Sequence, residues 1–285
     1  MKSKFNTILV PVNFSDYAAH AMDLAIEIAQ KRSSKILLLH VINVPDYRGV
    51  VEGVKVNFLD SVRYVTSQHL DGLVDKAKDH GIEASYTVVA GLPGAEIVKF
   101  AREKQVSLIV LGSKDYKHMD EMLGGSATER IVRYTDCPVI TAKAPIHLAS
   151  VKNVVFATDL KTTHTFITSE LKSLIALTGA NLHILKVNTR ETWMPDVQIE
   201  KQLKAFNDIH GFENFTFKVC NSETIEDGIV HYYENIGAEA VAMSIHSLYH
   251  HNSRSSNYFI TEKVLQSGPG LLWTCANESS RSWGS

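Results

Sequence analysis

Cysteine is scarce in this sequence, and long apolar runs are absent from it. Its 285 residues include three widely spaced cysteines, Cys137, Cys220 and Cys275, which cannot all pair with one another. This pattern indicates buried thiols in a reducing compartment. No apolar run approaches the roughly 20 residues that span a bilayer, and the opening MKSKFNTILVPV lacks the cleavage site of a signal peptide. We therefore expect a cytoplasmic protein with no membrane partner.

A strong charge of either sign is also missing. Lys and Arg number 29 against 31 Asp and Glu, so the formal net charge is −2. This balance argues against a protein that binds nucleic acid through an electropositive surface. With 45% hydrophobic and 21% charged residues, the composition is that of an ordinary globular protein. The length suits two domains of about 140 residues each.

What the sequence does contain is an alternation of strand and helix patterns. Short apolar strand runs occupy residues 8–12, 35–41, 85–90, 107–112 and 138–142. Helical patterns lie between them, and a loop of roughly 15 residues is expected before the second helix, whose apolar stripe begins at Leu70. This alternation predicts an α/β fold with a doubly wound parallel sheet.

The same pattern restarts in the second half of the chain. VVFATDL from Val154 aligns with ILVPVNF from Ile8, and LHILKV from Leu182 aligns with ILLLHV from Ile36, both at an offset of 146 residues. AVAMS at 240–244 aligns with LIVLG at 108–112, at an offset of 132. A repeat this long predicts tandem domains, which we place at residues 1–145 and 150–275. The polar residues 276–285 are expected to form a disordered tail or one added in cloning.

Three segments of the first half resemble the universal stress protein family. They are ILVPVNFS near the start, LLLHV in the second strand run and LGSKDYKHMDEMLGGSATERIVRYTDCPVITA at 111–142. The second half resembles the family more weakly, through VVFATDL, LHILKV and AVAMSIHS. The resemblance implies a five-stranded parallel sheet of order 3-2-1-4-5, flanked by helices, in each domain. It also implies that domains pair about a pseudo-twofold axis through their last strands.

The last strand run of each domain supports such pairing. Val139–Ala142 and Leu271–Thr274 are short, apolar and terminal, and an exposed strand edge invites a partner. The other copy within one chain is present at high effective concentration. We therefore expect an internal pseudo-dimer of the two domains, and a homodimer of the whole chain is a further partner to consider.

Many members of this family bind ATP between the ends of strands 1 and 4, and others do not. The ATP-binding members carry glycine, two residues, glycine, nine residues, glycine, and then serine or threonine. Here Gly112 matches the first glycine, but Asp115 stands at the second. By resemblance, the residues placed at ATP are Pro11, Asn13, Val41, Gly112, Ser113, Gly125, Ser126 and Ala127.

Two departures weaken this ATP site. Asp115 places a carboxylate against the phosphates, and like charges at close range repel. Asn13 replaces an aspartate that the family uses beside the adenine or ribose. An alternative also explains Ser126 without any ligand, because Ser126 and Glu129 have the S-x-x-E spacing of a helix capping box. Both interpretations stay open on the sequence alone.

The second half departs further from the nucleotide motif. Ser244 stands at the place of the first glycine. Tyr258 and Phe259 stand at the places of the last glycine and the serine, where two bulky rings should block a phosphate. Asp159, by contrast, keeps the strand-1 aspartate that the first half has lost. ATP is therefore less expected here than in the first half.

Three histidines follow the fourth strand run of the second half. Imidazole is a common zinc ligand, but no Cys, Asp or Glu in this loop completes four ligands. We therefore expect solvated histidines and no metal at His246, His250 and His251.

The sequence offers no nucleophile–base pair and no carboxylate pair with an evident role. We therefore expect a non-enzymatic, cytoplasmic stress-response protein that acts through protein interaction or small-ligand sensing, with a degraded ATP site. The alternative is an ATP-binding switch that uses the loop from Gly112 to Ser126. A third hypothesis, an adenylating enzyme of the wider fold, is disfavoured because NFSDY follows the first strand in place of an S-G-G-x-D-S type motif.

Overall fold

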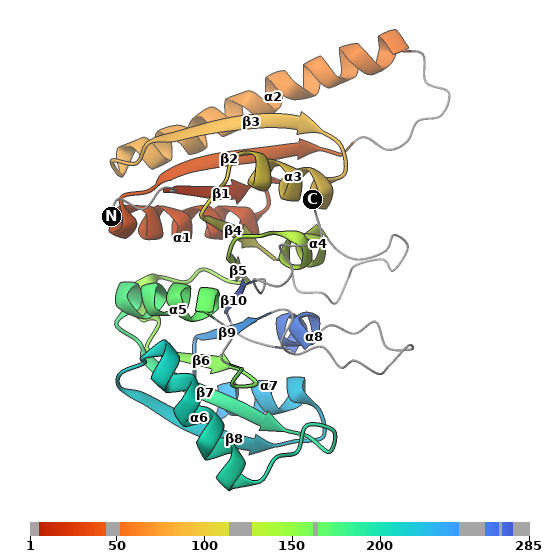
Figure 1. The fold of residues 1–285 in the computed structure, drawn as a ribbon. Helices are drawn as coiled ribbons and strands as arrows, with labels where there is room; N and C mark the ends of the chain where they lie inside the picture. The colour runs from red at the N-terminus through yellow and green to blue at the C-terminus, as the bar shows by residue number, and fades with distance from the viewer. Residues whose placement is uncertain are drawn as a thin grey trace.

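Ten strands form one sheet in the computed structural model, which describes residues 6–43, 52–113, 127–161, 165–244, 260–267 and 270–275 (Figure 1). The elements of the first half are β1 (Thr7–Pro11), α1 (Asp16–Arg32), β2 (Lys35–Ile42), α2 (Glu52–Asp79), β3 (Ala84–Ala90), α3 (Pro93–Glu103), β4 (Leu108–Gly112), α4 (Ala127–Tyr134) and β5 (Val139–Ala142). A short 3-10 helix, η2 (Leu148–Ser150), precedes the second half. The elements of the second half are β6 (Asn153–Ala157), α5 (Thr165–Thr178), β7 (Asn181–Asn188), α6 (Asp196–His210), β8 (Phe215–Asn221), α7 (Ile225–Asn235), β9 (Ala240–Ser244), α8 (Ile260–Ser267) and β10 (Leu271–Cys275).

The sheet order is β3-β2-β1-β4-β5-β10-β9-β6-β7-β8. Counted in its own strands, each half has the order 3-2-1-4-5 with parallel ladders, which confirms the predicted doubly wound fold. Between the halves, β5 and β10 pair antiparallel. The two halves therefore share one continuous sheet, joined through the strand-5 edges as the sequence predicts.

Helices cover both faces of the sheet. On one face, α1, α2, α5 and α6 pack over a single buried apolar cluster that runs through both halves. On the other face, α3 and α4 cover one cluster while α7 and α8 cover another. Strands buried on both faces explain why β2 and β7 contain long apolar runs, because neither face of such a strand meets water.

Helix α2 is longer than the helix expected from the sequence. The buried residues Leu70, Val74 and Ala77 mark the stripe, but the helix already begins at Glu52, where the sequence predicted a loop. Figure 1 shows its N-terminal turns extending past the ends of the strands. Apolar residues at helical spacing precede Leu70 in the sequence as well, at Val54, Phe58, Val62 and Val65, so the longer helix agrees with the sequence pattern.

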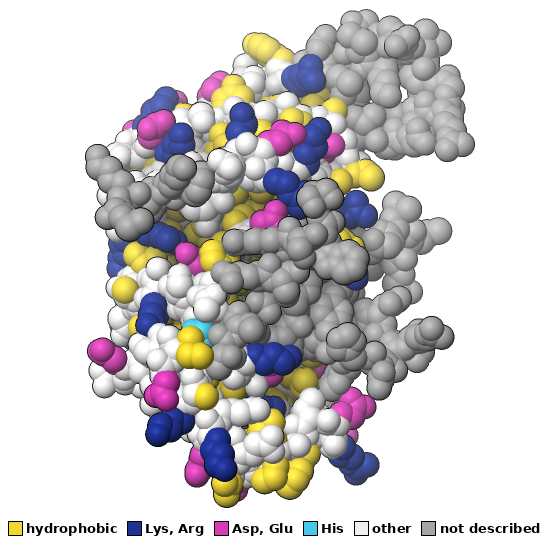
Figure 2. Space-filling view, viewed as in Figure 1, with side chains coloured by type: hydrophobic (Ala, Val, Ile, Leu, Met, Phe, Trp, Pro, Cys, Tyr) yellow, Lys and Arg dark blue, Asp and Glu magenta, His cyan; other side chains and the backbone are white. Residues whose placement is uncertain are grey.

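Side chains of helix α1 also form hydrogen bonds and an ion pair with residues that follow the first half. The Glu27 carboxylate accepts hydrogen bonds from His147 Nδ1 and, at 2.8 Å, from the Leu148 backbone N–H. At the last residue of α1, an Arg32 guanidinium nitrogen lies 3.7 Å from a carboxylate oxygen of Glu170 in α5. The halves are thus linked by side chains as well as by the β5–β10 ladder. Among the helices that the structure describes, none has the length and apolar character needed to cross a membrane. On the face shown in Figure 2, the Lys and Arg side chains are interspersed with those of Asp and Glu.

Candidate functional site

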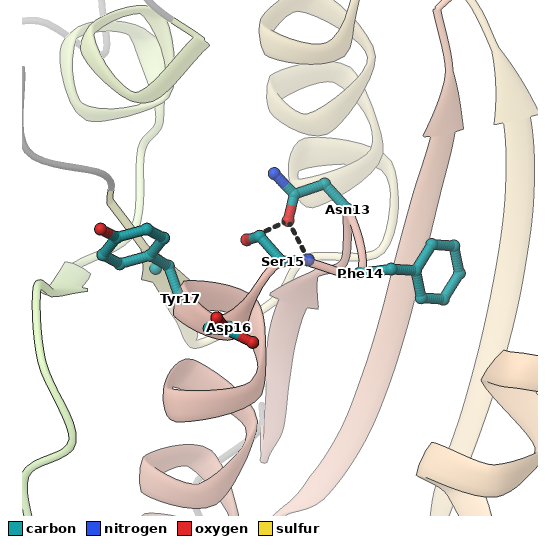
Figure 3. A pocket seen from close by; sticks show the side chains of 6 residues that line it. Asn13, Phe14, Ser15, Asp16 and Tyr17 are labelled. Carbon is teal, nitrogen blue, oxygen red and sulfur yellow. Dashed lines mark hydrogen bonds between the residues drawn. The ribbon is translucent and has the colours of Figure 1, made fainter. Parts of the chain in front are cut away.

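A pocket of about 370 Å³ lies at the carboxyl ends of β1 and β4 (Figure 3). In open α/β sheets this edge is where ligands bind, because the chain leaves the central strands there in opposite directions. The volume falls within the range of small-molecule sites, about 300–1,000 Å³. The pocket is lined by the residues that connect β1 to α1 and by the last residue of β4, namely Asn13, Phe14, Ser15, Asp16, Tyr17 and Gly112.

Asn13 forms a tight side-chain turn at the base of this connection. Its Oδ1 accepts the Ser15 backbone N–H at 3.2 Å and the Ser15 hydroxyl at 2.7 Å. The Ser15 Oγ in turn accepts the Ala18 backbone N–H at 3.3 Å, which caps α1. The side-chain oxygen of Asn13 is therefore already hydrogen-bonded within the chain. Figure 3 shows the side-chain amide nitrogen of Asn13 turned away from Ser15.

Gly112 is required by the packing of α1 on β4. A Cβ atom added at Gly112 would lie 2.0 Å from the Tyr17 carbonyl oxygen and 2.2 Å from the Tyr17 carbonyl carbon. Both contacts are with backbone, which cannot rotate away as a side-chain tip can. A glycine is needed at this position whether or not a ligand binds, so it does not by itself mark a phosphate site.

Phe14 presents an aromatic surface at one side of the pocket. Its φ is +61°, a left-handed conformation that is uncommon for a bulky residue, and its side chain is 43% exposed. The ring lies 4.8 Å from the ring of His40 at the end of β2 and 5.4 Å from that of His69 in α2. Figure 3 shows Phe14 and Tyr17 pointing in opposite directions from the connection.

The second half repeats this turn with charged residues. Asp159, which aligns with Asn13, accepts the Lys161 backbone N–H at 3.2 Å and pairs with the Lys161 ammonium at 2.8 Å. Leu160 has a φ of +62°, close to that of Phe14, but it is only 3% exposed and belongs to the core. The backbone course is the same, while the side chain that lines a pocket in the first half is buried in the second.

A buried lysine lies near Asp159. Lys186 in β7 is at the position equivalent to His40 in β2. Its side chain is 5% exposed, and its ammonium donates a hydrogen bond to the Val187 carbonyl oxygen at 3.1 Å. Burial lowers the pKa of Lys186, the Asp159 carboxylate opposes that shift, and the Lys161 ammonium adds to it. The Asp159 carboxylate therefore already interacts with two cations of its own chain.

Comparison with known proteins identifies the family. The family model described as the universal stress protein family matches residues 4–143. Universal stress protein YxiE of Bacillus subtilis is 31% identical over 148 residues, which cover 49% of this chain and 99% of that protein. The chain belongs to the universal stress protein family.

Two further relatives of this universal stress protein extend the comparison. Universal stress protein MJ0531 of Methanocaldococcus jannaschii is 28% identical over 142 residues, which cover 50% of this chain and 84% of that protein. The crystal structure of a universal stress protein from Archaeoglobus fulgidus has a TM-score of 0.74 and covers 96% of this chain and 99% of its own. At 22% identity that likeness concerns the fold alone, and it spans both halves.

The pocket of this universal stress protein contains two of the residues that the sequence placed at ATP, Asn13 and Gly112. None of the other described positions lines it. Pro11 ends β1, and the Val41 side chain packs on the α3 and α4 face of the core. Ser113 is buried, and its backbone N–H donates at 3.0 Å to the last residue of β5. That N–H belongs to the sheet and is not available to a phosphate.

The remaining predicted positions are described only in part. Ala127 is exposed and begins α4. The positions outside the described residues are Asp115, Gly125, Ser126, His246, His250, His251, Tyr258 and Phe259. Within the described part of the chain, no three His, Cys, Asp or Glu side chains are grouped so that they could hold a metal ion.

Sequence reasoning missed four residues of the pocket. Phe14, Ser15, Asp16 and Tyr17 all line it, but the motif considered from the family names only Asn13 in this segment. Their position directly after β1 was the available signal, since loops at the carboxyl ends of parallel strands converge on one edge.

Proposed function

We propose that this universal stress protein is a non-enzymatic, cytoplasmic stress-response protein that acts through protein interaction or small-ligand sensing, and that its ATP site is degraded. One observation carries the proposal. In both halves the polar side chain after the first strand is engaged within the chain, by Ser15 for Asn13 and by Lys161 for Asp159. The Asn13 Oδ1 already accepts two hydrogen bonds, as many as it has lone pairs, so a ribose or adenine donor would have to displace one of them. At the Asp159 carboxylate, which has lone pairs to spare, such a donor would have to compete with Lys161.

The charge around the pocket gives further support. Asp16 lines it, and Asp115 follows β4 in the sequence. Two unit charges of the same sign 4 Å apart repel by about 4 kcal/mol near a protein surface. The N-terminus of α1 offsets part of this repulsion through its dipole. A neutral or cationic small molecule therefore suits this pocket better than a triphosphate without its metal ion.

The alternative function is an ATP-binding switch that uses the loop from Gly112 to Ser126. It is favoured by the place of the pocket, at the carboxyl ends of β1 and β4 and beside Gly112. Mg²⁺ brought by the nucleotide would reduce the repulsion from Asp16 and Asp115.

Isothermal titration with Mg-ATP at fixed salt separates the two proposals. We expect weak or no binding by the wild type. We expect at least about tenfold tighter binding after Asp115→Gly, which corresponds to about 1.4 kcal/mol. Adding Asn13→Asp should tighten binding further only if the restored carboxylate receives a ribose or adenine donor. The matched control is Asp159→Asn, which makes the reverse exchange in the second half and should leave the affinity unchanged.

Two outcomes would change the proposal. Micromolar binding by the wild type would favour the switch. No binding by any variant would mean that the first-half site is closed for a reason other than Asp115 and Asn13. Phosphate release from ATP, followed in the same samples, tests the non-enzymatic character, and we expect a rate no higher than that of buffer.

A further inference from the structure

The described sheet ends in two edge strands, β3 and β8, which lie at opposite ends of the molecule (Figure 1). The strand-5 edges are already used, because β5 and β10 pair with each other inside the chain. If a further molecule adds to the described sheet by strand pairing, it must therefore do so at β3 or β8. A free edge carries unpaired N–H and C=O groups, so proteins usually protect it.

The two edges differ at their centres. The β2–β3 and β7–β8 registers align Ala84 with Phe215, and hence Thr87 with Lys218. β3 reads ASYTVVA, without charge or proline, while β8 reads FTFKVCN. A lysine on an edge strand is a common protection against pairing, because pairing would bury or oppose its charge. β8 therefore carries a protecting charge at the position where β3 has a threonine.

The outer side of β3 has a regular set of hydrogen-bonding groups. On the inner side, Glu83 O accepts the Ile36 N–H and the Gly91 N–H is donated to β2. Backbone groups alternate in direction along a strand, so the odd-numbered residues between these two also turn toward β2. The N–H and C=O groups of Tyr86 and Val88 consequently face outward.

We propose that β3 docks a second copy of this chain, in an antiparallel β3–β3 pair centred on Thr87. A twofold axis at this residue places Tyr86 opposite the partner's Val88, so that their outward N–H and C=O groups bond in both directions. Thr87 then faces the partner's Thr87, and threonine pairs are favourable across strands. Glu83 lies opposite the partner's Gly91, so no like charges meet.

An antiparallel pair of equivalent strands already exists within the molecule. β5 and β10 are equivalent strands that pair antiparallel about the internal pseudo-twofold axis. In β3 the side chains of Tyr86, Val88 and Val89 are only partly buried, so a partner strand would remove more apolar surface from water. An edge pair covers less than the roughly 1,200–2,000 Å² of a stable interface. We therefore expect a weak dimer, with a Kd of about 1–100 µM.

The wild type and its variants can be compared by sedimentation velocity from about 1 to about 200 µM, a span chosen to bracket that Kd. We expect a concentration-dependent dimer for the wild type. Thr87→Lys should raise the Kd at least about tenfold, because two lysines would face each other. Thr87→Val, which adds no charge, should retain the dimer, and circular dichroism checks that both variants are folded.

The reciprocal variant tests the role of Lys218. Lys218→Thr should open the β8 edge, so that each molecule pairs at both ends and assemblies larger than a dimer form. A Lys218→Thr protein that stays at the size of the wild type refutes the protective role of this lysine. Wild-type protein that is monomeric across the whole range, or a dimer unaffected by Thr87→Lys, overturns the proposal.

Hydrogen exchange locates the contact. On raising the protein concentration, the amides of Tyr86 and Val88 should gain protection, while those of Phe217 and Val219, their counterparts in β8, should not. Protection that appears in β8, or in neither strand, contradicts the placement of the partner at β3.

Discussion

Replacing Gly112 by alanine should destabilise the protein through a clash that involves no ligand. The new Cβ would lie 2.0 Å from the Tyr17 carbonyl oxygen and 2.2 Å from its carbon, so α1 must move away from β4. Overpacking a buried site costs about 1–3 kcal/mol. Because both contacts are with backbone, we expect the upper end, about 3 kcal/mol. At about 2–4 °C per kcal/mol, the Tm should fall by about 6–12 °C.

The matched control is Gly72→Ala in α2. A Cβ at Gly72 meets no heavy atom within 4 Å, and alanine favours a helix over glycine by about 1 kcal/mol. The same chemical change should therefore stabilise the protein slightly at Gly72 and destabilise it strongly at Gly112. Urea unfolding followed by circular dichroism measures both. If Gly112→Ala stays within about 0.5 kcal/mol of the wild type, the packing argument for this glycine is wrong.

Three further predictions concern ionisable groups. Burial raises the pKa of Glu170, with Arg32 opposing. Stability should therefore fall as pH rises from the usual pKa of a glutamate, about 4.3, to the raised value, and urea melts of Glu170→Gln should lack this fall. The hydrogen bond to Glu27 raises the pKa of His147. The stability that the protonated imidazole adds should therefore be full below about pH 6.5 and be lost as pH rises through the raised pKa. Urea melts of Glu27→Gln should lack this pH dependence. Burial raises the pKa of Cys137 to about 12, so its thiol should resist iodoacetamide at about pH 8 until urea unfolds the chain, as mass spectrometry can show.

The order of the strands could be predicted because the family resemblance implies it, and the repeat extends the same order to the second half. The two short strands at Val139–Ala142 and Leu271–Cys275 even indicated how the halves join, since each is apolar and has no later partner within its own half. These are properties of whole segments, and many residues contribute to each. The start of α2 at Glu52 was missed although apolar residues at helical spacing, Val54, Phe58 and Val62, are present in its first turns, because the prediction used only the stripe that begins at Leu70.

The candidate site was less predictable because it depends on single contacts. The sequence places Asn13 and Gly112 at the right edge of the sheet, but it does not show that the Asn13 oxygen turns back to Ser15. It also suggests a phosphate as the reason for Gly112, whereas the close approach of Tyr17 is sufficient. Such distances depend on how α1 packs against β4, and no pattern in the sequence predicts this packing.

The β5–β10 ladder places Ile140 opposite Trp273. The registers with β4 and β9 make these equivalent positions of the two halves. In a dimer of identical chains, a residue on the axis meets its own copy, so the site would hold two isoleucines or two tryptophans. Here a large ring faces a smaller side chain, a combination that a dimer of identical chains cannot form. Mutation can therefore change one side of the axis alone, and the two ends of the molecule are free to evolve separate tasks.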